Sequence, residues 1–381
     1  MPRLLLIPCR SGTGRGRQPA GQPMMSGNAT LLPDLRPKFR SSSRWIVRAV
    51  VCGLLSLLLA ACGQPSDQPD VRRFSGSTMG TYYTITLVAE AGQSFEFSDA
   101  AMQAAIEAEL AQINQIMSTY IPDSELMQLN AAEVGVWQPL SAPLYDILQL
   151  SQQISGLTQG AFDVTVGPLV NLWGFGPDPD GELPTAEAIA AVQQRVGYQQ
   201  LELEEQRARK QSDIFVDLSG IAKGYGVDWL GQLFDQHGVS HYLINIGGDL
   251  LARGVNPDGE PWRIAIEIPS AERQGIQRVV PISNVALVTS GDYRNYRQDN
   301  GQRRSHIIDP TTGYPVNHSL ASVTVIADTA AEADALATAM MVMGTEAALA
   351  LAEQENHAVV LIERQAQEFK ETYSSAFTPY R

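Results

Sequence analysis

Cysteine is scarce in this chain: its 381 residues include three, Cys9, Cys52 and Cys62, all within the first 62 positions. The sequence after Cys62 therefore contains no thiol. It can form no disulfide, and it offers neither a cysteine nucleophile nor cysteine ligands for zinc. Covalent thiol catalysis and cysteine-ligated metal sites are excluded for that part of the protein.

Basic residues are also few. The chain has 27 Lys and Arg against 41 Asp and Glu, and positions 1–61 hold nine of the basic residues but one of the acidic ones. The remainder thus carries 18 basic and 40 acidic side chains, a net charge near −22. Nucleic-acid binding requires clustered Lys and Arg. We therefore expect no nucleic-acid partner.

A hydrophobic stretch at residues 49–61 (AVVCGLLSLLLAA) is too short to span a bilayer comfortably, which takes about 20 residues. It follows the basic segment 36–48 and ends in small residues, as a secretory signal does. The sequence LAAC at residues 59–62 resembles the lipobox of bacterial lipoproteins, in which the cysteine becomes the lipidated first residue. We therefore expect residues 1–61 to be a lipoprotein signal peptide and Cys62 to be lipidated.

A polar, proline-containing segment (GQPSDQPD) follows the expected lipidation site. We expect residues 62–70 to be a flexible tether and residues 71–381 to form the folded domain. The lipid would anchor the protein to a membrane on its periplasmic side, or to the outer face of a cell with a single membrane. Gly63 is not the Asp that commonly signals inner-membrane retention, so the choice of membrane stays open.

The hydrophobic pattern of the domain alternates between helical and strand periodicity. Helical spacing and suitable first residues predict helices over 98–117, 143–155, 185–196 and 222–237, and one or two over 329–355. Alternating β-branched residues predict strands at 81–88, 201–205, 213–218, 241–246, 262–268, 279–283, 286–290 and 358–363. This mixture predicts an α+β fold of mixed helices and antiparallel-rich sheets that the helices cover.

Asp334 and Thr338 lie four residues apart in a stretch rich in Ala, Leu and Met without Gly or Pro. Such a stretch favours a helix, on which positions i and i+4 project from the same face. That face then offers a carboxylate oxygen and a hydroxyl oxygen. These are ligands for Mg²⁺ rather than for zinc or copper, although a solvated helix surface would also tolerate the pair.

Two glycine-containing segments end predicted strands. DLSGIAKG, residues 217–224, predicts a strand, a tight turn and a helix with Lys223 about one turn inside it. The N–H groups at such a helix start favour an anion; alternatively, Asp217 merely caps the helix. NIGGD, residues 245–249, permits a close backbone approach at its glycines, or simply forms a bulge or hairpin.

Two further segments combine turn residues with functional side chains. SGDY at 290–293 lies close in sequence to SHIIDPTTGYP at 305–315, whose His306 is either a core histidine or part of a site. Residues 160–176 join aromatic side chains to glycines, and aromatic faces can cover a planar ring or fill a core.

Together these segments resemble the FAD:protein FMN transferases, the ApbE-type flavin transferases. The matching segments cover nearly all of residues 74–345: GSTMGT at 76–81, MSTY at 117–120, DSEL at 123–126, GAFDVT at 160–165, DLSGIAKG at 217–224, NIGGD at 245–249, SGDY at 290–293, SHIIDPTTGYP at 305–315 and DALAT at 334–338. No single segment is decisive, but their order along the chain is specific.

The resemblance implies a T-fold-like domain with an FAD cleft between two packed subdomains. It implies that FAD contacts Met79, Tyr120, Ala161, Phe162, Asp163, Asp217, Lys223 and Ile308. It also implies that Mg²⁺ is held by the side chains of Asp334 and Thr338 and by the carbonyl of Gly220, a position often occupied by Ala, Ser or Thr in other members.

The implied reaction moves the FMN half of FAD onto a threonine hydroxyl of a target protein and releases AMP. The implied targets are subunits of the sodium-translocating NADH:quinone reductase and of Rnf-type complexes, and the family favours the inner membrane as the location. The acceptor hydroxyl needs a proton acceptor. We expect His306, because an unperturbed imidazole titrates near neutral pH, with Asp292 as its competitor. Alternatives are an FAD pyrophosphatase that yields FMN and AMP, and a flavin-binding lipoprotein without catalysis.

Overall fold

A computed structural model of the protein describes residues 69–381 apart from 177–182, 271–274, 294–295, 300–301 and 367. The predicted signal peptide, Cys62 and most of the predicted tether lie outside the described residues, so those assignments stay predictions. The first strand begins at Val71. Within the described part of the chain, no helix is both long and apolar enough to cross a membrane.

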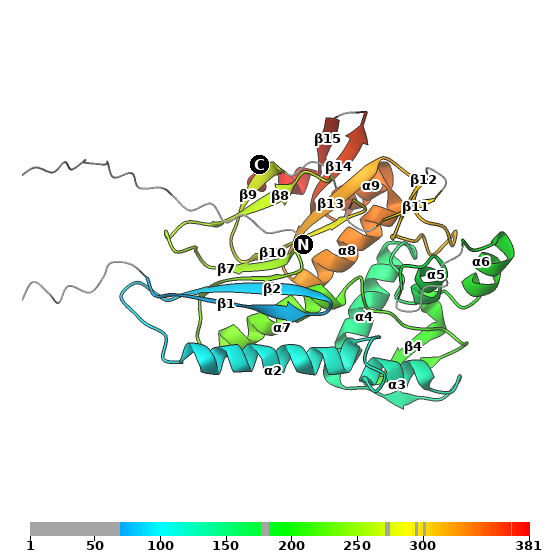
Figure 1. Ribbon diagram of the computed structural model, residues 1–381, viewed down its shortest axis with the longest axis horizontal. Coiled ribbons are helices and arrows are strands. Elements are labelled where there is room, and N and C mark those ends of the chain that lie inside the picture. The colour runs from blue at the N-terminus through cyan, green and yellow to red at the C-terminus, as the bar shows by residue number, and fades with distance from the viewer. Residues whose placement is uncertain (1–68, 177–182, 271–274, 294–295, 300–301, 367) are drawn as a thin grey trace, which may run out of the picture. The chain divides into compact units, whose positions relative to one another are not determined.

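The largest element is an antiparallel sheet of eight strands, in the order β1-β2-β6-β7-β10-β13-β14-β15 (Figure 1). Its strands are β1 (Val71–Thr78), β2 (Thr81–Val88), β6 (His241–Ile246), β7 (Asp249–Arg253), β10 (Val285–Gly291), β13 (Leu320–Ala327), β14 (Ala358–Gln365) and β15 (Glu368–Tyr373). Smaller antiparallel sheets comprise β3 (Gln138–Pro139) with β5 (Arg207–Lys210) and β4 (Leu201–Glu204), β8 (Trp262–Glu267) with β9 (Ile276–Ile282), and β11 (Tyr296–Asp299) with β12 (Gln302–Ser305).

The helices confirm the predicted α+β class. They are α2 (Asp99–Met117), α3 (Glu125–Ala131), α4 (Ala142–Leu157), α5 (Gly167–Leu172), α6 (Ala186–Gln193), α7 (Ala222–Gln236), α8 (Ala330–Met343) and α9 (Thr345–Gln354), with short 3₁₀ turns η2 (Tyr198–Gln200) and η3 (Ser375–Tyr380). Each predicted helix is present, and the stretch 329–355 forms two. The break lies at Gly344, whose φ of 76° ends α8 in a conformation that favours glycine.

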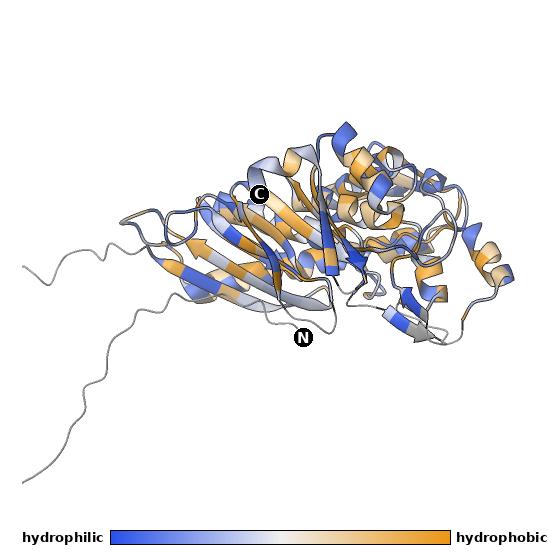
Figure 2. Ribbon diagram, turned by 90° about the horizontal axis from the view of Figure 1, so that it is seen from above, coloured by the Kyte–Doolittle hydropathy of each residue, from blue (hydrophilic) through white to orange (hydrophobic). Residues whose placement is uncertain are grey.

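Both faces of the large sheet are covered. One face packs against helices that include α2, α4, α7 and α8, and the other against β8, β9 and η3. Along β14, Val359 and Leu361 point into the first core, whereas Val360 and Ile362 point into the second. This explains why β14 has a continuous apolar run rather than alternation. Figure 2 shows the hydrophobic residues concentrated along these strands and the neighbouring helices.

One predicted strand is wrong. Residues 213–218 contain no strand, although their sequence alternates as a strand does. Instead, the side-chain amide of Asn130 bonds both backbone groups of Val216: Nδ2 donates to its oxygen at 2.9 Å and Oδ1 accepts from its nitrogen at 2.7 Å. The nitrogen of Asp217 donates to the Val164 oxygen at 2.7 Å. The segment is therefore extended and hydrogen-bonded, but its partners are a side chain and a loop.

Candidate active site

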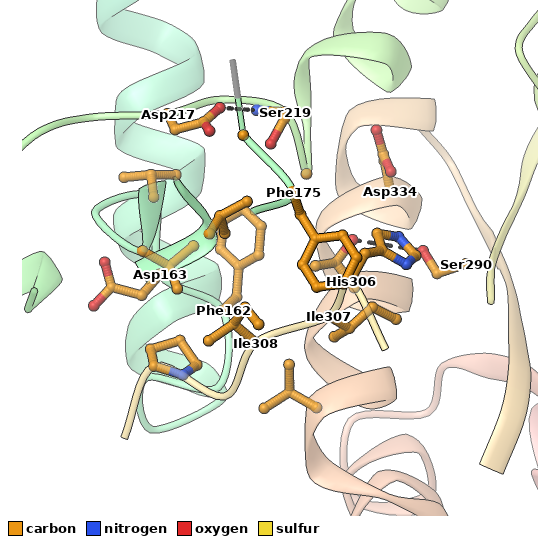
Figure 3. A pocket seen from close by; sticks show the side chains of 18 of the residues that line it. Phe162, Asp163, Phe175, Asp217, Ser219, Ser290, His306, Ile307, Ile308 and Asp334 are labelled. Atoms are coloured by element: carbon orange, nitrogen blue, oxygen red, sulfur yellow. Dashed lines mark hydrogen bonds between the residues drawn. The ribbon is translucent and has the colours of Figure 1, made fainter. Parts of the chain in front are cut away.

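A cavity of about 430 Å³ lies where the sheet and α8 meet the loops that follow α4 and β12 (Figure 3). Every predicted FAD, metal or catalytic residue lines it except Met79 and Asp292. The lining residues are Thr119, Tyr120, Ala161, Phe162, Asp163, Val164, Val166, Val170, Phe175, Gly176, Asp217, Ser219, Gly220, Lys223, Thr289, Ser290, Gly291, His306, Ile307, Ile308, Pro310, Asp334, Thr338 and Val342. Segments more than 200 positions apart in sequence thus meet at one cavity.

One wall of the cavity carries oxygen atoms. Asp334 and Thr338 project from α8, as their spacing predicts. Thr338 Oγ1 lies 3.5 Å from Ser290 Oγ on β10. Gly220 lies close to the same hydroxyl: a Cβ added at Gly220 would be 3.6 Å from Thr338 Oγ1. The wall therefore presents a carboxylate, two hydroxyl groups and the backbone of a turn.

Lys223, which also lines the cavity, joins two buried carboxylates. Its Nζ lies 2.6 Å from Asp249 Oδ2, 3.1 Å from Asp334 Oδ2 and 3.3 Å from Asp334 Oδ1. Burial alone would lower the pKa of Lys223, but the charges of Asp249 and Asp334 outweigh this and raise it. Burial and the nearby Asp334 raise the pKa of Asp249, while Lys223 opposes that shift. Two carboxyl groups thus lie against one ammonium, so the cluster presents more acidic than basic groups to a cation at the cavity wall.

The start of α7 differs from the prediction. Lys223 is the second residue of the helix rather than lying one turn inside it. Asp217 does not cap the helix, since its Oδ1 accepts a hydrogen bond from the nitrogen of Ser219 at 2.9 Å. Instead, the nitrogen of Gly224 donates to Asp334 Oδ2 at 3.2 Å. A protein carboxylate therefore already occupies part of the predicted anion position at this helix start.

The oxygen wall suits a magnesium site that is completed by substrate phosphates. Among the described residues, no group of three or more His, Cys, Asp or Glu side chains could hold a metal by itself. Mg²⁺, however, is commonly held by one or two carboxylates together with substrate phosphates and water. Among the residues that the structure describes, the hydrogen-bond partner of Asp334 Oδ1 is Lys223 at 3.3 Å, so a lone-pair direction remains for an ion. Asp334, Thr338 and Gly220 are suitable for a site that phosphate completes.

Other lining residues are aromatic and aliphatic. Phe162 is buried, whereas Tyr120 has 73% of its surface exposed at the rim. Phe175 and His306 lie edge to face, with ring centroids 6.3 Å apart, in the middle of the view in Figure 3. Ile308 is buried, and it lies beside Phe162 in Figure 3. Such side chains can cover a planar ring on its faces.

Two residues predicted to contact FAD, Asp163 and Asp217, also accept hydrogen bonds from the protein itself. Asp163 Oδ1 accepts from the Thr165 nitrogen and hydroxyl at 2.7 and 2.6 Å, and Oδ2 accepts from the Tyr198 nitrogen at 2.8 Å. Its carboxylate points away from His306 in Figure 3. Burial raises the pKa of Asp163, and these hydrogen bonds lower it in part. Burial likewise raises the pKa of Asp217, against the opposing hydrogen bonds from Ser219. Asp163 thus shapes the loop that lines the cavity.

The two predicted proton acceptors are placed differently. His306 lines the cavity, directly after β12. Asp292 does not line it, and its carboxylate is bonded to two arginines, by Arg364 Nη1 at 2.9 Å and by Arg303 Nη1 at 3.2 Å. A base must reach the proton that it takes, so this geometry argues against Asp292 as the competitor of His306.

Met79 is the other predicted contact outside the cavity. It has a φ of 49° in the turn between β1 and β2 and packs against α7, where a Cβ on Gly226 would lie 2.8 Å from the Met79 methyl carbon. The structure thus places Met79 in the packing against α7 rather than in the lining of the cavity.

Sequence reasoning missed Ser290 and Phe175 as individual lining residues, and Asp249 as a partner of Lys223. Each belongs to a segment whose glycines or aromatic side chains predicted a site, so the signal lay in the segment rather than in the single residue. Which side chain of a turn faces a cavity depends on contacts with distant elements.

Comparisons with known proteins identify the family of this chain. The model of the ApbE family matches residues 79–362. The chain is 42% identical over 327 residues to the FAD:protein FMN transferase of Vibrio cholerae, covering 85% of this chain and 96% of that protein. It is 40% identical over 339 residues to the protein of the same name from Escherichia coli, covering 85% and 95%.

Solved structures give the same result. The flavin transferase ApbE from Vibrio cholerae superposes with a TM-score of 0.76 at 40% identity, covering 82% of this chain and all of that one. The apo form of the Pseudomonas stutzeri flavinyl transferase ApbE has a TM-score of 0.76 at 38% identity, covering 83% and 98%. This protein therefore belongs to the ApbE family of flavin transferases.

Proposed function

We propose that this protein transfers the FMN half of FAD to a threonine hydroxyl of a target protein, in a Mg²⁺-dependent reaction that releases AMP. One observation carries the proposal: the oxygen wall of Asp334, Thr338 and Gly220 faces the same cavity as Phe162, Phe175 and His306. The cavity thus combines donors for a hard cation and its phosphates with aromatic cover for a flavin.

The residues divide into two sets by their chemistry. Tyr120, Phe162 and Ile308 offer aromatic and aliphatic surface for a ring system, and Tyr120 lies exposed where a ring could stack on it. Lys223 adds a cation beside Asp334. Asp334, Thr338 and Gly220 would hold Mg²⁺, which would neutralise phosphate charge as the AMP leaves.

The chemical step is a displacement at phosphorus. The threonine oxygen forms a bond to the phosphorus of the FMN phosphate, and the bond from that phosphorus to the bridging oxygen breaks. The bridging oxygen leaves with AMP. His306 accepts the threonine proton, since it is the imidazole on the cavity wall among the described residues. The product is a flavin joined to the target through a phosphoester.

The location and partners of the protein form part of the proposal. Lipidation at Cys62 would hold the domain on the periplasmic side of a membrane through a short polar segment. Membrane complexes that carry flavin joined to threonine, such as the sodium-translocating NADH:quinone reductase and Rnf-type complexes, would then lie within reach. This assignment rests on the lipobox and on the family resemblance.

Mass spectrometry tests the reaction directly. A candidate acceptor incubated with the protein, FAD and Mg²⁺ should gain the mass of FMN minus water, with one AMP released for each acceptor. EDTA should prevent both changes. Release of FMN and AMP without a modified acceptor would instead identify a pyrophosphatase, and the absence of AMP under all conditions would leave a flavin-binding protein.

A further inference from the structure

Asp249 stands out because it is a buried acidic residue that does not line the cavity. It is the first residue of β7, and its residue surface is 3% exposed. The turn before it holds Gly247 and Gly248 at φ values of 61° and 112°, and the Gly248 nitrogen donates to Asn245 Oδ1 at 2.9 Å. A buried carboxylate is costly unless it is paired. Its partner is Lys223, which does line the cavity.

The ammonium of Lys223 lies unequally between its two carboxylates. The distance to Asp249 is 2.6 Å, whereas the distances to Asp334 are 3.1 and 3.3 Å. Asp249 therefore holds the stronger contact. Asp334 Oδ2 is also bonded to the nitrogen of Gly224, which leaves Oδ1 as the less engaged oxygen.

We propose that Asp249 is a positioning residue that draws the Lys223 ammonium toward itself, limits its contact with Asp334, and so keeps an Asp334 oxygen available for a divalent cation. This inference rests on the proposed function, because it concerns the cation of that reaction. Without the Asp249 charge, the ammonium would move to its remaining anionic partner. It would then compete with the cation for Asp334, and the site would also lose one negative charge. Both effects weaken cation binding.

The test compares Asp249→Asn with the wild-type full-length chain. Mn²⁺ serves as the probe, since its binding to the FAD-loaded protein can be titrated by electron paramagnetic resonance. We expect the dissociation constant for Mn²⁺ to rise about tenfold or more, and the affinity for FAD in EDTA to change less than twofold. In turnover, the apparent KM for Mg²⁺ should rise by a similar factor, while kcat at saturating Mg²⁺ stays within about threefold.

Asp235→Asn is the matched control. Asp235 is an exposed residue of α7, the helix that carries Lys223, and its Oδ1 accepts a hydrogen bond from the hydroxyl of Tyr242 at 2.9 Å. Twelve positions separate it from Lys223, about 18 Å along a helix. Its amide variant loses the same charge without touching the lysine, so the Mn²⁺ dissociation constant should not change.

A second variant distinguishes competition between the Lys223 ammonium and the cation from a structural disturbance of the site. In Lys223→Gln/Asp249→Asn, the competing ammonium is gone, and Mn²⁺ affinity should return to within about threefold of wild type. A double variant as weak as Asp249→Asn would overturn the competition mechanism, as would unchanged Mn²⁺ affinity in the single variant. If the wild-type protein itself bound no Mn²⁺ with FAD, the metal assignment of the proposed function would fall together with this inference.

Discussion

The backbone N–H of Gly224 on α7 donates a hydrogen bond to Asp334 Oδ2 on α8, at 3.2 Å. The orientation of the Asp334 carboxylate therefore depends on how closely the two helices pack. At Gly224 they pack so closely that a Cβ would lie 2.2 Å from the Ala330 oxygen. The start of α8 is fastened to α7 as well, because Asp228 accepts from the nitrogens of Ala330 and Ala331 at 2.8 and 2.9 Å.

Gly224→Ala should push the two helices apart. Because the blocked atoms belong to the backbone of α8, they cannot rotate away as a side chain would. We expect a loss of about 3 kcal/mol in the free energy of unfolding, at the upper end of overpacking effects. Urea denaturation followed by circular dichroism measures it.

Gly156→Ala is the control for that substitution. Gly156 lies in α4, and nothing lies within 4 Å of the position that its Cβ would take. Alanine in such a place should stabilise the protein by about 0.5–1 kcal/mol. Equal effects at both glycines would contradict the packing argument.

Asp334→Ala should abolish Mg²⁺-dependent flavin transfer while the protein still folds. Lys223 keeps Asp249 as a partner in this variant, so no buried charge is left alone. We expect the transfer rate to fall at least about a hundredfold, since a carboxylate ligand is lost from the proposed metal site. Release of AMP at saturating FAD measures the rate.

Glu346→Ala serves as the control for Asp334→Ala. Glu346 is an exposed carboxylate in the first turn of the neighbouring helix α9. Its removal should leave the rate unchanged. Full activity in a folded Asp334→Ala protein would remove the metal assignment.

His306→Ala should slow transfer much more than it weakens FAD binding. A positioned proton acceptor contributes typically 10²–10⁴-fold to a rate, so we expect a loss of about that size. Stopped-flow transfer to an acceptor and fluorescence titration of FAD separate the two effects. His237→Ala, at the exposed end of α7, should behave as wild type. A normal transfer rate with normal FAD binding would eliminate His306 as the base.

The Asp228 cap of α8 should make stability depend on pH. Burial raises the pKa of Asp228 to about 6, although its hydrogen bonds with the nitrogens of Ala330 and Ala331 partly oppose the shift. The folded state therefore binds this proton more tightly than the unfolded state, in which the pKa is about 3.9. The contribution of Asp228 to stability is then largest below pH 4 and falls as the pH rises through 6.

Asp228→Asn removes that dependence. Between pH 4 and pH 7, the free energy of unfolding of the wild type should fall relative to the variant, by at most about 3 kcal/mol. Denaturation of both proteins across this range gives the difference. A difference that stays constant, or that rises with pH, would show that the folded pKa of Asp228 is not raised.

Much of the architecture follows from local patterns. The strand at 241–246 and the helix at 222–237 were predicted almost to the residue, because alternation and helical spacing record which face of each element is buried. The segment 213–218 was mispredicted as a strand. Its residues alternate as in a strand, but the backbone of Val216 forms its hydrogen bonds with the side chain of Asn130 instead of with a neighbouring strand. The short helix α3 was not predicted, since seven residues offer little periodicity.

The i, i+4 relationship of Asp334 and Thr338 can be read from the amino-acid sequence, because the geometry of one helix dictates it. The positions of Gly220 and Ser290 beside Thr338, and of Lys223 between Asp249 and Asp334, arise only when the chain folds. The lysine contacts join positions 26 and 111 residues apart. Such contacts depend on how helices pack on a sheet, which the periodicity of a single segment does not record.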